Sequence, residues 1–332
     1  MSIPIEQFII DKTGAQRCRS EAVIQELWSG YGSIRRYLLE GADRATLIAK
    51  HISPPKKATH PRGWSSPLSH QRKLKSYQVE SVWYQKYASL SDQKCRVPEC
   101  LSVTQYNEEV VILLEDLCST GYSEKRTVVS QYALEACLLW LAEFHATFMG
   151  HSAEGLWESG TYWHLETRPD ELERLAKEDQ ALYESAYEID SKLKSSSYQT
   201  LVHGDAKLAN FCFTPDDRSV SAVDFQYVGG GCGMRDVAYF IGSCFGEEEC
   251  ERQSPALLDY YFCALRQAIM ERNVAVDREA LEADWRELYP FAWTDFHRFL
   301  KGWHPGHWKI HSYSERLSQN VIAQIQKERS EF

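Results

Sequence analysis

The sequence lacks the features that identify several large classes of proteins. No run approaches the roughly 20 consecutive apolar residues that a membrane helix requires. The first residues, MSIPIEQFIIDKTG, contain no basic segment followed by an apolar one, so no secretory signal is predicted. The ten cysteines form no C-x-x-C pair, which disfavours a structural zinc site or a redox motif. We therefore expect a cytoplasmic protein with reduced cysteines and without a membrane partner.

An excess of basic residues is also absent. The chain has 37 Lys and Arg against 47 Asp and Glu, a formal net charge of −10. This argues against general nucleic-acid binding, because the phosphate backbone requires a basic surface. An acidic average would suit a cationic substrate, although it is common among proteins. What the chain does have is length: its 332 residues, 43% of them hydrophobic, suffice for two packed lobes, each with its own core.

Short apolar segments separated by glycine turns predict an antiparallel sheet near the N-terminus. Its strands are expected over residues 24–28, 34–39, 44–52 and 110–114. Prolines from residue 54 to residue 67 predict a loop over 53–70, and the absence of Pro and Gly predicts a helix over 71–89. The first lobe is therefore expected to be a small sheet with one helix, ending near residue 117.

Helical patterns dominate beyond this point. A stripe of Leu and Phe predicts a helix over 126–148, and a charged segment predicts a solvent-facing helix over 170–194. Residues 202–224 show short apolar runs around a turn at 214–217, which indicates small strands. The remainder is expected to be helical, and residues 285–308 are rich in aromatic side chains.

The most informative motif lies among these small strands. The pattern H-x-D-x-x-x-x-N covers residues 203–210, and Asp-Phe-Gln at 224–226 follows a predicted hairpin. Phosphoryl transfer needs a carboxylate to orient the attacking hydroxyl and accept its proton, and oxygen ligands to hold Mg²⁺ on the phosphates. Asp205 fits the first role, and Asn210 and Asp224 fit the second. The alternative is a surface hairpin that carries these residues by chance.

With these motifs the chain resembles the aminoglycoside/choline kinase-like phosphotransferase superfamily, and within it the ecdysteroid-kinase-like group. That group typically has a His-Gly-Asp…Asn loop, then Asp-Phe-Gln, then a helix that starts with Asp-(Leu/Val)-Ala-Tyr-Phe. The corresponding segments here are 203–210, 224–226 and 236–240, together with 114–117 and 141–145. The likeness covers about residues 24–245.

The resemblance implies an α+β, two-lobed protein-kinase-like fold. A small antiparallel-sheet lobe, residues 1–117, would bind the nucleotide. A mostly helical lobe, residues 118–332, would carry the catalytic residues and bind the substrate. The implied cofactors are ATP and Mg²⁺.

One position in the catalytic loop departs from the group. Lys207 stands where the ecdysteroid-type loop usually has Trp, and a lysine there, as in many protein kinases, could touch the γ-phosphate. We therefore count Lys207 with Asp205 among the catalytic residues. Asp236 is expected to brace the loop through hydrogen bonds, and His145 and His203 are expected to be core histidines.

Lys50 and Glu80 are the expected ion pair of the nucleotide site. Lys50 lies near the end of the third predicted strand and is assigned to the α- and β-phosphates. A kinase lysine needs a carboxylate on the following helix to hold it extended, and Glu80 is the only acid between Asp43 and Asp92. On a helix, Glu80 shares a face with aromatic residues, which favours burial beside a cation. Taken alone, both residues would be interpreted as surface charges.

Two further segments are assigned to ATP on less specific patterns. Gly30, Gly32 and Ser33 lie between two strands, where backbone N–H groups could approach the phosphates, although a plain β-turn explains the glycines equally well. Glu115 and Leu117, where the sheet lobe ends, would form the hinge that offers backbone groups to adenine; the alternative is a simple strand end. The proline-rich loop before the first long helix belongs to a basic stretch and could close over the phosphates.

The acceptor is expected to be a small alcohol. Only twelve residues separate Asp224 from Asp236, too few for the long segment on which protein kinases bind a peptide. An aromatic pocket for a flat, apolar or cationic alcohol, with charge from Asp284 or Asp295, is one candidate site. Its aromatic residues would be Trp285, Tyr289, Phe291, Trp293, Phe296, Trp303 and Trp308. The alternatives are that these side chains form the core and that the acceptor lies along 170–194.

These patterns predict an ATP- and Mg²⁺-dependent phosphotransferase that phosphorylates a hydroxyl group of a small molecule, similar to choline, aminoglycoside or ecdysteroid kinases. Two alternatives stay open at this stage: a non-catalytic, pseudokinase-type nucleotide-binding module, and a kinase that acts on a small group carried by a protein. The presence of the full set of expected catalytic, metal and lysine-pairing residues disfavours the first. The sequence names neither the acceptor nor the oligomeric state.

Overall fold

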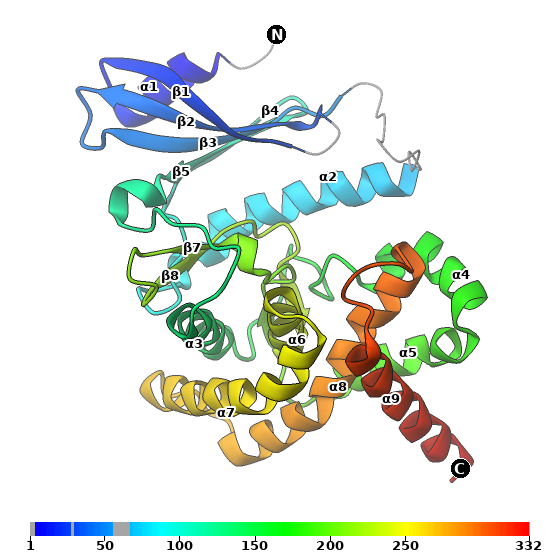
Figure 1. Ribbon diagram of the computed structural model, residues 1–332. Helices are drawn as coiled ribbons and strands as arrows, with labels where there is room; N and C mark the ends of the chain where they lie inside the picture. Colours follow the sequence, from blue (N-terminus) through cyan, green and yellow to red (C-terminus); the bar gives the residue numbers. More distant parts are fainter. Residues whose placement is uncertain (1–3, 28–29, 56–66, 332) are drawn as a thin grey trace.

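The computed structural model describes residues 4–27, 30–55 and 67–331. Within these residues a five-stranded sheet forms the upper part of the molecule in Figure 1, and a larger, mostly helical part lies below it. The predicted α+β fold, with an antiparallel sheet at the N-terminal end and a helical remainder, is confirmed.

The sheet is antiparallel throughout, with the strand order β1-β2-β3-β5-β4. Its strands are β1 (Arg17–Glu26), β2 (Gly32–Glu40), β3 (Thr46–Ile52), β4 (Cys100–Tyr106) and β5 (Glu109–Glu115). The prediction missed β4, whose residues are half-buried or exposed without a regular alternation. It also placed the start of the first strand too late; residue 28 of that strand and residue 29 of the turn after it lie outside the described residues.

The two faces of the sheet have different neighbours. Alternation along β3 places Leu47 and Ala49 on one face, where they pack with Ile9 of α1 (Ile5–Thr13), a helix that the sequence pattern did not reveal. Lys50 and Ile52 point from the other face, toward α2 and the helical part, and Ile52 belongs to the main core. The pleat of β3 therefore directs Lys50 into the interior.

α2 (Pro67–Val82) runs below the sheet, between it and the helices of the lower part (Figure 1). It continues as a π turn (Trp83–Tyr87) and a short 3₁₀ turn (Ala88–Leu90). The predicted loop over 53–70 is wrong at its end, because the helix already begins at Pro67, and proline fits the first helical turn. The middle of that loop, 56–66, lies outside the described residues.

The lower part consists of packed helices and two small strand pairs (Figure 1). The helices are α3 (Gln131–Thr147), α4 (Pro169–Glu178), α5 (Gln180–Ser195), α6 (Met234–Cys244), α7 (Glu247–Glu271), α8 (Arg278–Trp303) and α9 (Ser312–Ser330). The strand pairs are β6 (Thr200–Val202) with β9 (Gly229–Gly231), and β7 (Phe211–Phe213) with β8 (Val220–Ala222). The predicted small strands around the 214–217 turn are thus confirmed.

Two helix predictions need correction. The helix expected over 126–148 begins only at Gln131, because the side chain of Ser130 caps it by accepting a hydrogen bond from Ala133 N. The single helix expected over 170–194 is two helices. Asp179 has an extended backbone and caps the second helix, and the buried Ile189 is one of several apolar residues that exclude a wholly solvent-facing helix.

The aromatic residues 285–308 do not line one common pocket. Trp285 and Trp293 belong to the main core, whereas Phe296 packs in a second cluster with Trp163 and Tyr239. The indole of Trp285 is fully buried and donates to the carbonyl of Tyr198. Most of this segment is therefore core, and the second cluster contacts the catalytic loop through the hydrogen bond from Tyr239 to Asp205. No helix in the described ranges is both long and apolar enough to cross a membrane.

Replacing Trp285 with Leu should lower the free energy of unfolding by about 2–5 kcal/mol, as large-to-small changes in a packed core do. The matched control is Trp308→Leu, because the side chain of Trp308 is 59% exposed and its loss should change stability by no more than about 0.5 kcal/mol. Denaturant unfolding of both variants measures the difference. Equal stabilities would contradict the assignment of Trp285 to the core.

Candidate active site

The loop between β6 and β7 is fixed by buried hydrogen bonds. The backbone N–H groups of His203 and Gly204 donate to the two carboxylate oxygens of Asp236, at 2.6 and 2.9 Å. Asp236 also accepts from His145 Nε2 at 3.2 Å. The bracing role predicted for Asp236 and the core positions predicted for both histidines are therefore confirmed.

Gly204 allows the loop to pass close to its neighbours. Its φ is +78°, and a Cβ atom at this position would lie 2.0 Å from the carbonyl oxygen of Tyr227. A larger residue would therefore both strain the backbone and clash with it. The ring of His203 adds support, since its Nδ1 accepts from the N–H of Asp205 and its Nε2 donates to the carbonyl of Val223.

Asp205 is buried at the centre of the loop and receives three side-chain hydrogen bonds. The donors are Lys207 Nζ at 2.9 Å, Asn210 Nδ2 at 3.0 Å and the hydroxyl of Tyr239 at 3.1 Å. Burial raises the pKa of Asp205 above its ordinary value, and the charge of Asp224 adds to this, while Lys207 opposes it. The result is an oriented carboxylate whose affinity for a proton is increased.

The β7–β8 hairpin brings Asp224 back to this loop, as the sequence predicted. Val223 N donates to the carbonyl of Asn210 at 2.9 Å, which fixes the two segments side by side. Asp224 has a φ of +70°, a left-handed conformation that is uncommon for a residue other than glycine. Its Oδ1 accepts from Gln226 Nε2 at 2.6 Å.

The charge of Asp224 is maintained by nearby cations. Burial alone would raise its pKa, but Lys50, Lys73 and Lys207 outweigh this and lower the pKa of Asp224 below its ordinary value. Asn210 Nδ2 faces Asp205, so its amide oxygen lies on the opposite side of the amide group. The two residues assigned to the metal thus supply one carboxylate and one amide oxygen.

Lys50 and Glu80 form the predicted ion pair. Their Nζ and Oε2 atoms are 2.6 Å apart, and both residues are buried, with 3% and 1% of their surfaces exposed. Lys50 Nζ also lies 3.6 Å from Asp224 Oδ1. Burial would lower the pKa of Lys50, yet the two carboxylates more than compensate and raise it. Lys50 is therefore charged and connects α2 with the Asp224 segment.

The substitution Glu80→Gln should weaken the binding of ATP with Mg²⁺ by about tenfold or more, since a hydrogen bond to a charged group contributes about 1.5–3 kcal/mol. Without the charge of Glu80, Lys50 is expected to turn toward Asp224 and compete with the metal. Calorimetric titration measures the affinity, and Glu108→Gln, in the exposed turn before β5, is the control. An unchanged affinity in Glu80→Gln would show that Lys50 is held without it.

Sequence reasoning missed a second lysine beside Asp224. Lys73 Nζ, on α2, donates to Gln226 Oε1 at 2.8 Å and lies 4.7 Å from the centroid of the Tyr77 ring. Burial lowers its pKa to about 8. Gln226 therefore connects Lys73 to Asp224. In the sequence, Lys73 is distinguished only by its position in the basic stretch. Several other lysines and arginines of that stretch were equally plausible candidates for a place beside Asp224.

The remaining predicted nucleotide residues lie on the sheet or directly beside it rather than in this cluster. Gly32 has a φ of +128°, and a Cβ there would lie 1.9 Å from the carbonyl oxygen of His51, so the close approach of β2 and β3 already requires a glycine. Gly30 is also left-handed, and the hydroxyl of Ser33 accepts from Arg35 Nε. Backbone conformation and close packing therefore explain both glycines without a ligand. That these residues bind phosphate stays a proposal.

The segment at the end of β5 uses its side chains within the protein. Glu115 pairs with Arg96 at 2.5 Å, and Asp116 pairs with Arg36 at 2.7 Å. Leu117 begins a 3₁₀ turn, and its carbonyl accepts from Tyr122 N. A nucleotide at this edge would therefore meet main-chain groups rather than the carboxylates.

Comparison with known proteins identifies structures with a similar fold. The structure shares the protein-kinase-like fold of two small-molecule kinases. One is choline kinase from Cryptosporidium parvum, with 10% identity over 94% of this chain and 89% of that chain and a TM-score of 0.53. The other is the amicoumacin kinase hAmiN in complex with AMP-PNP, Ca²⁺ and Ami, with 12% identity, 92% and 88% coverage and a TM-score of 0.51. At these identities the likeness establishes the fold.

The family model of the ecdysteroid kinase-like family matches residues 154–273, which include the catalytic loop, the Asp224 segment and Asp236. Among curated proteins, no sequence matches the chain significantly. The family match and the shared fold confirm the predicted resemblance to the kinase-like phosphotransferase superfamily.

Proposed function

We propose that the chain is an ATP- and Mg²⁺-dependent phosphotransferase that phosphorylates a hydroxyl group of a small molecule. The observation that carries the proposal is the convergence of three segments far apart in the sequence. The Lys50–Glu80 pair contacts Asp224, and Asp224 lies beside the loop that holds Asp205 and Asn210. A surface hairpin that carried these residues by chance would not place them against a buried lysine.

In the proposed reaction each residue of this cluster has one role. Asp205 accepts the proton of the acceptor hydroxyl as that oxygen bonds to the γ-phosphorus. The bond between the γ-phosphorus and the β–γ bridging oxygen breaks, and ADP leaves. Lys50 is assigned to the α- and β-phosphates, and Lys207, which donates to Asp205, is assigned to the γ-phosphate.

The residues assigned to the metal fit Mg²⁺, which prefers carboxylate and amide oxygens and keeps several waters. The lowered pKa of Asp224 keeps this carboxylate charged at neutral pH. Held by Asp224 and Asn210, Mg²⁺ would neutralise the negative charge of the phosphates. Among the described residues no group of three or more His, Cys, Asp or Glu converges as a metal site. The AMP-PNP and Ca²⁺ in the amicoumacin kinase structure support nucleotide use with a divalent ion.

We assign residues 1–117 to nucleotide binding and 118–332 to catalysis and acceptor binding. The small acceptor is supported by the short connection from Asp224 to α6, part of which forms the strand β9 against β6. That connection is integrated into the lower part and leaves little chain to form a peptide platform.

An ATP-consumption assay over a panel of small alcohols tests the proposal, with Mg²⁺ and with a chelator. Choline, aminoglycosides, sugars and sterols sample cationic, polar and apolar acceptors, and hydroxy acids are included as anionic ones. The proposal expects consumption that requires both Mg²⁺ and one class of acceptor. Tight, Mg²⁺-dependent ATP binding without consumption over the whole panel would instead favour the pseudokinase alternative.

A further inference from the structure

A wall of aromatic side chains lies beside Asp205, on the side of the second cluster. Tyr239 of α6 donates its hydroxyl to Asp205, and its ring centroid is 5.7 Å from that of Tyr162 and 4.8 Å from that of Phe296. Phe299 continues the wall against Tyr162, with the ring centroids 5.5 Å apart. Of these rings, that of Tyr239 is in direct contact with the catalytic loop, through its hydrogen bond to Asp205.

Cations of the protein itself already occupy the faces of these rings. Lys309, in the segment between α8 and α9, places its ammonium 5.1 Å from the ring centroid of Tyr239 and 5.5 Å from that of Phe296. The guanidinium of Arg168 lies 5.8 Å from the ring centroid of Tyr162. An aromatic site for a cationic acceptor needs free ring faces, because the attraction comes from the ring itself. Here a cationic acceptor would meet positive charges.

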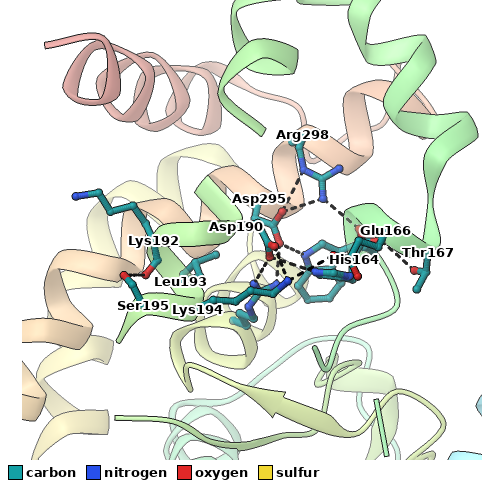
Figure 2. A network of polar contacts seen from close by, with 12 residues as sticks. His164, Glu166, Thr167, Asp190, Lys192, Leu193, Lys194, Ser195, Asp295 and Arg298 are labelled. Atoms are coloured by element: carbon teal, nitrogen blue, oxygen red, sulfur yellow. Dashed lines mark hydrogen bonds and ion pairs between the residues drawn. The ribbon is translucent and has the colours of Figure 1, made fainter. Parts of the chain in front are cut away.

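The carboxylate expected to attract a cation is engaged elsewhere. Asp295 is buried and accepts from Arg298 (Figure 2). It also accepts from Arg235 and from the indole of Trp163. The prediction that Asp295 adds charge to an acceptor pocket is therefore wrong, because two arginines neutralise it inside the protein. Asp284, the other candidate, accepts from Ser196 and lies in the first half of α8, whereas Asp295 lies in the second half.

Other carboxylates near the wall are also paired. Asp190, in the network of Figure 2, accepts from Arg235 and His164, and Lys194 lies 2.9 Å from its second oxygen. Glu171 pairs with Arg168 at 3.3 Å. The acidic average of the chain thus does not extend to the surroundings of Asp205.

Lys309, by contrast, has no hydrogen bond or ion pair from its ammonium within the part of the chain that the structure describes. Burial lowers its pKa to about 8; Asp205 acts to raise this pKa and Lys207 acts to lower it. A half-buried ammonium without a counterion is unfavourable, and an anion that binds to it removes this cost. Tyr239 links Lys309 to Asp205, because its ring lies under the ammonium and its hydroxyl donates to the carboxylate.

On the basis of the proposed function, we propose that the acceptor alcohol carries an anionic group, and that Lys309 binds this group while the hydroxyl lies at Asp205. Lys309 is then the residue that selects anionic over cationic acceptors. The aromatic wall contributes apolar contact to the part of the acceptor between the two groups.

Three matched probes test this: para-(hydroxymethyl)benzoate, para-(hydroxymethyl)benzamide and para-(hydroxymethyl)benzylammonium. They share one ring and one hydroxyl and differ in charge. Their affinities are measured by calorimetry at neutral pH, where Lys309 is largely protonated, in the presence of AMP-PNP and Mg²⁺. The benzoate should bind the wild-type protein about tenfold or more tightly than the benzylammonium, because a charge-assisted hydrogen bond contributes about 1.5–3 kcal/mol.

Lys309→Met should remove this preference, whereas Lys327→Met, at an exposed lysine of α9, should retain it. Equal or tighter binding of the benzylammonium to the wild type, a preference that survives Lys309→Met, or no binding of the benzoate would each overturn the proposal. Turnover of the same probes separates it from the proposed function. If the benzoate binds through Lys309 but is not phosphorylated, the result contradicts the proposed phosphotransfer and not the role of Lys309. If the cationic or neutral probe is phosphorylated in preference to the benzoate, the result contradicts the role of Lys309 and not the proposed phosphotransfer.

Discussion

Asp205→Asn should lower the turnover number by about 100-fold or more while the affinity for ATP stays close to that of the wild type. An amide has the shape of the carboxylate but cannot accept the proton of the acceptor hydroxyl. The affinity should persist because Lys50, Asp224 and Asn210, the groups assigned to the nucleotide and the metal, are unchanged.

The surroundings of Asp205 predict that this variant folds. Its carboxylate is buried, and burial raises its pKa. A neutral amide of the same shape should therefore be tolerated at this position. Asp259→Asn, a largely exposed residue of α7, is the control for expression and handling. Turnover of Asp205→Asn is compared at saturating ATP and acceptor, and a rate near that of the wild type would remove Asp205 from its proposed role.

Asp224→Ala should abolish the Mg²⁺-dependent part of ATP binding. This carboxylate is the only charged group among the two protein ligands assigned to the metal, and the hairpin β7–β8 fixes it beside Asn210. Calorimetric titration of ATP with and without Mg²⁺ gives the result directly. The expected affinity of the variant is the same under both conditions, and an unchanged Mg²⁺-dependent affinity would contradict the assignment.

The left-handed backbone of Asp224 makes a second variant useful. Alanine is strained at a φ of +70°, whereas asparagine adopts this region more readily and can accept the hydrogen bond from Gln226. Asp224→Asn should therefore fold as the wild type does and still lose most of its Mg²⁺-dependent binding, because the metal loses a charged ligand. Loss of binding in the alanine variant alone would indicate backbone damage rather than loss of a ligand.

The parts of the site that could be predicted are those encoded by short spacings. The catalytic loop and the Asp224 segment are separated by one hairpin, so that the chain between them fixes their proximity. Glu80 was predictable for a different reason, because it is the only acid within reach on the expected helix. In both cases local sequence limits the number of possible partners.

The residues that were missed depend on packing between distant elements. Lys73 reaches Gln226 across 153 positions of sequence, and Tyr239 reaches Asp205 across 34, with no spacing rule to predict either contact. Lys309 follows the aromatic segment in the chain but contacts a tyrosine of α6. The division of the segment 170–194 into two helices depends on the cap formed by a single aspartate, which any acidic helix could have contained.

If the acceptor is anionic, as we propose, the net charge of the whole chain points to the wrong class of acceptor. The value of −10 is a sum over the whole surface, whereas the acceptor meets only the residues around Asp205. There the described carboxylates are paired and the ring faces are covered by Lys309 and Arg168. The charge of the site depends on which side chains form ion pairs there, and the sequence does not show these pairs.

The most direct measurement of the central claim is the detection of the phosphorylated product. Phosphorus NMR of the protein with ATP, Mg²⁺ and the acceptor found in the panel should show a new phosphomonoester signal that grows as ADP forms. The signal should be absent with a chelator and reduced about 100-fold or more in rate with Asp205→Asn. ADP that forms together with free phosphate and no phosphomonoester, or a phosphomonoester that forms equally fast with Asp205→Asn, would contradict the account.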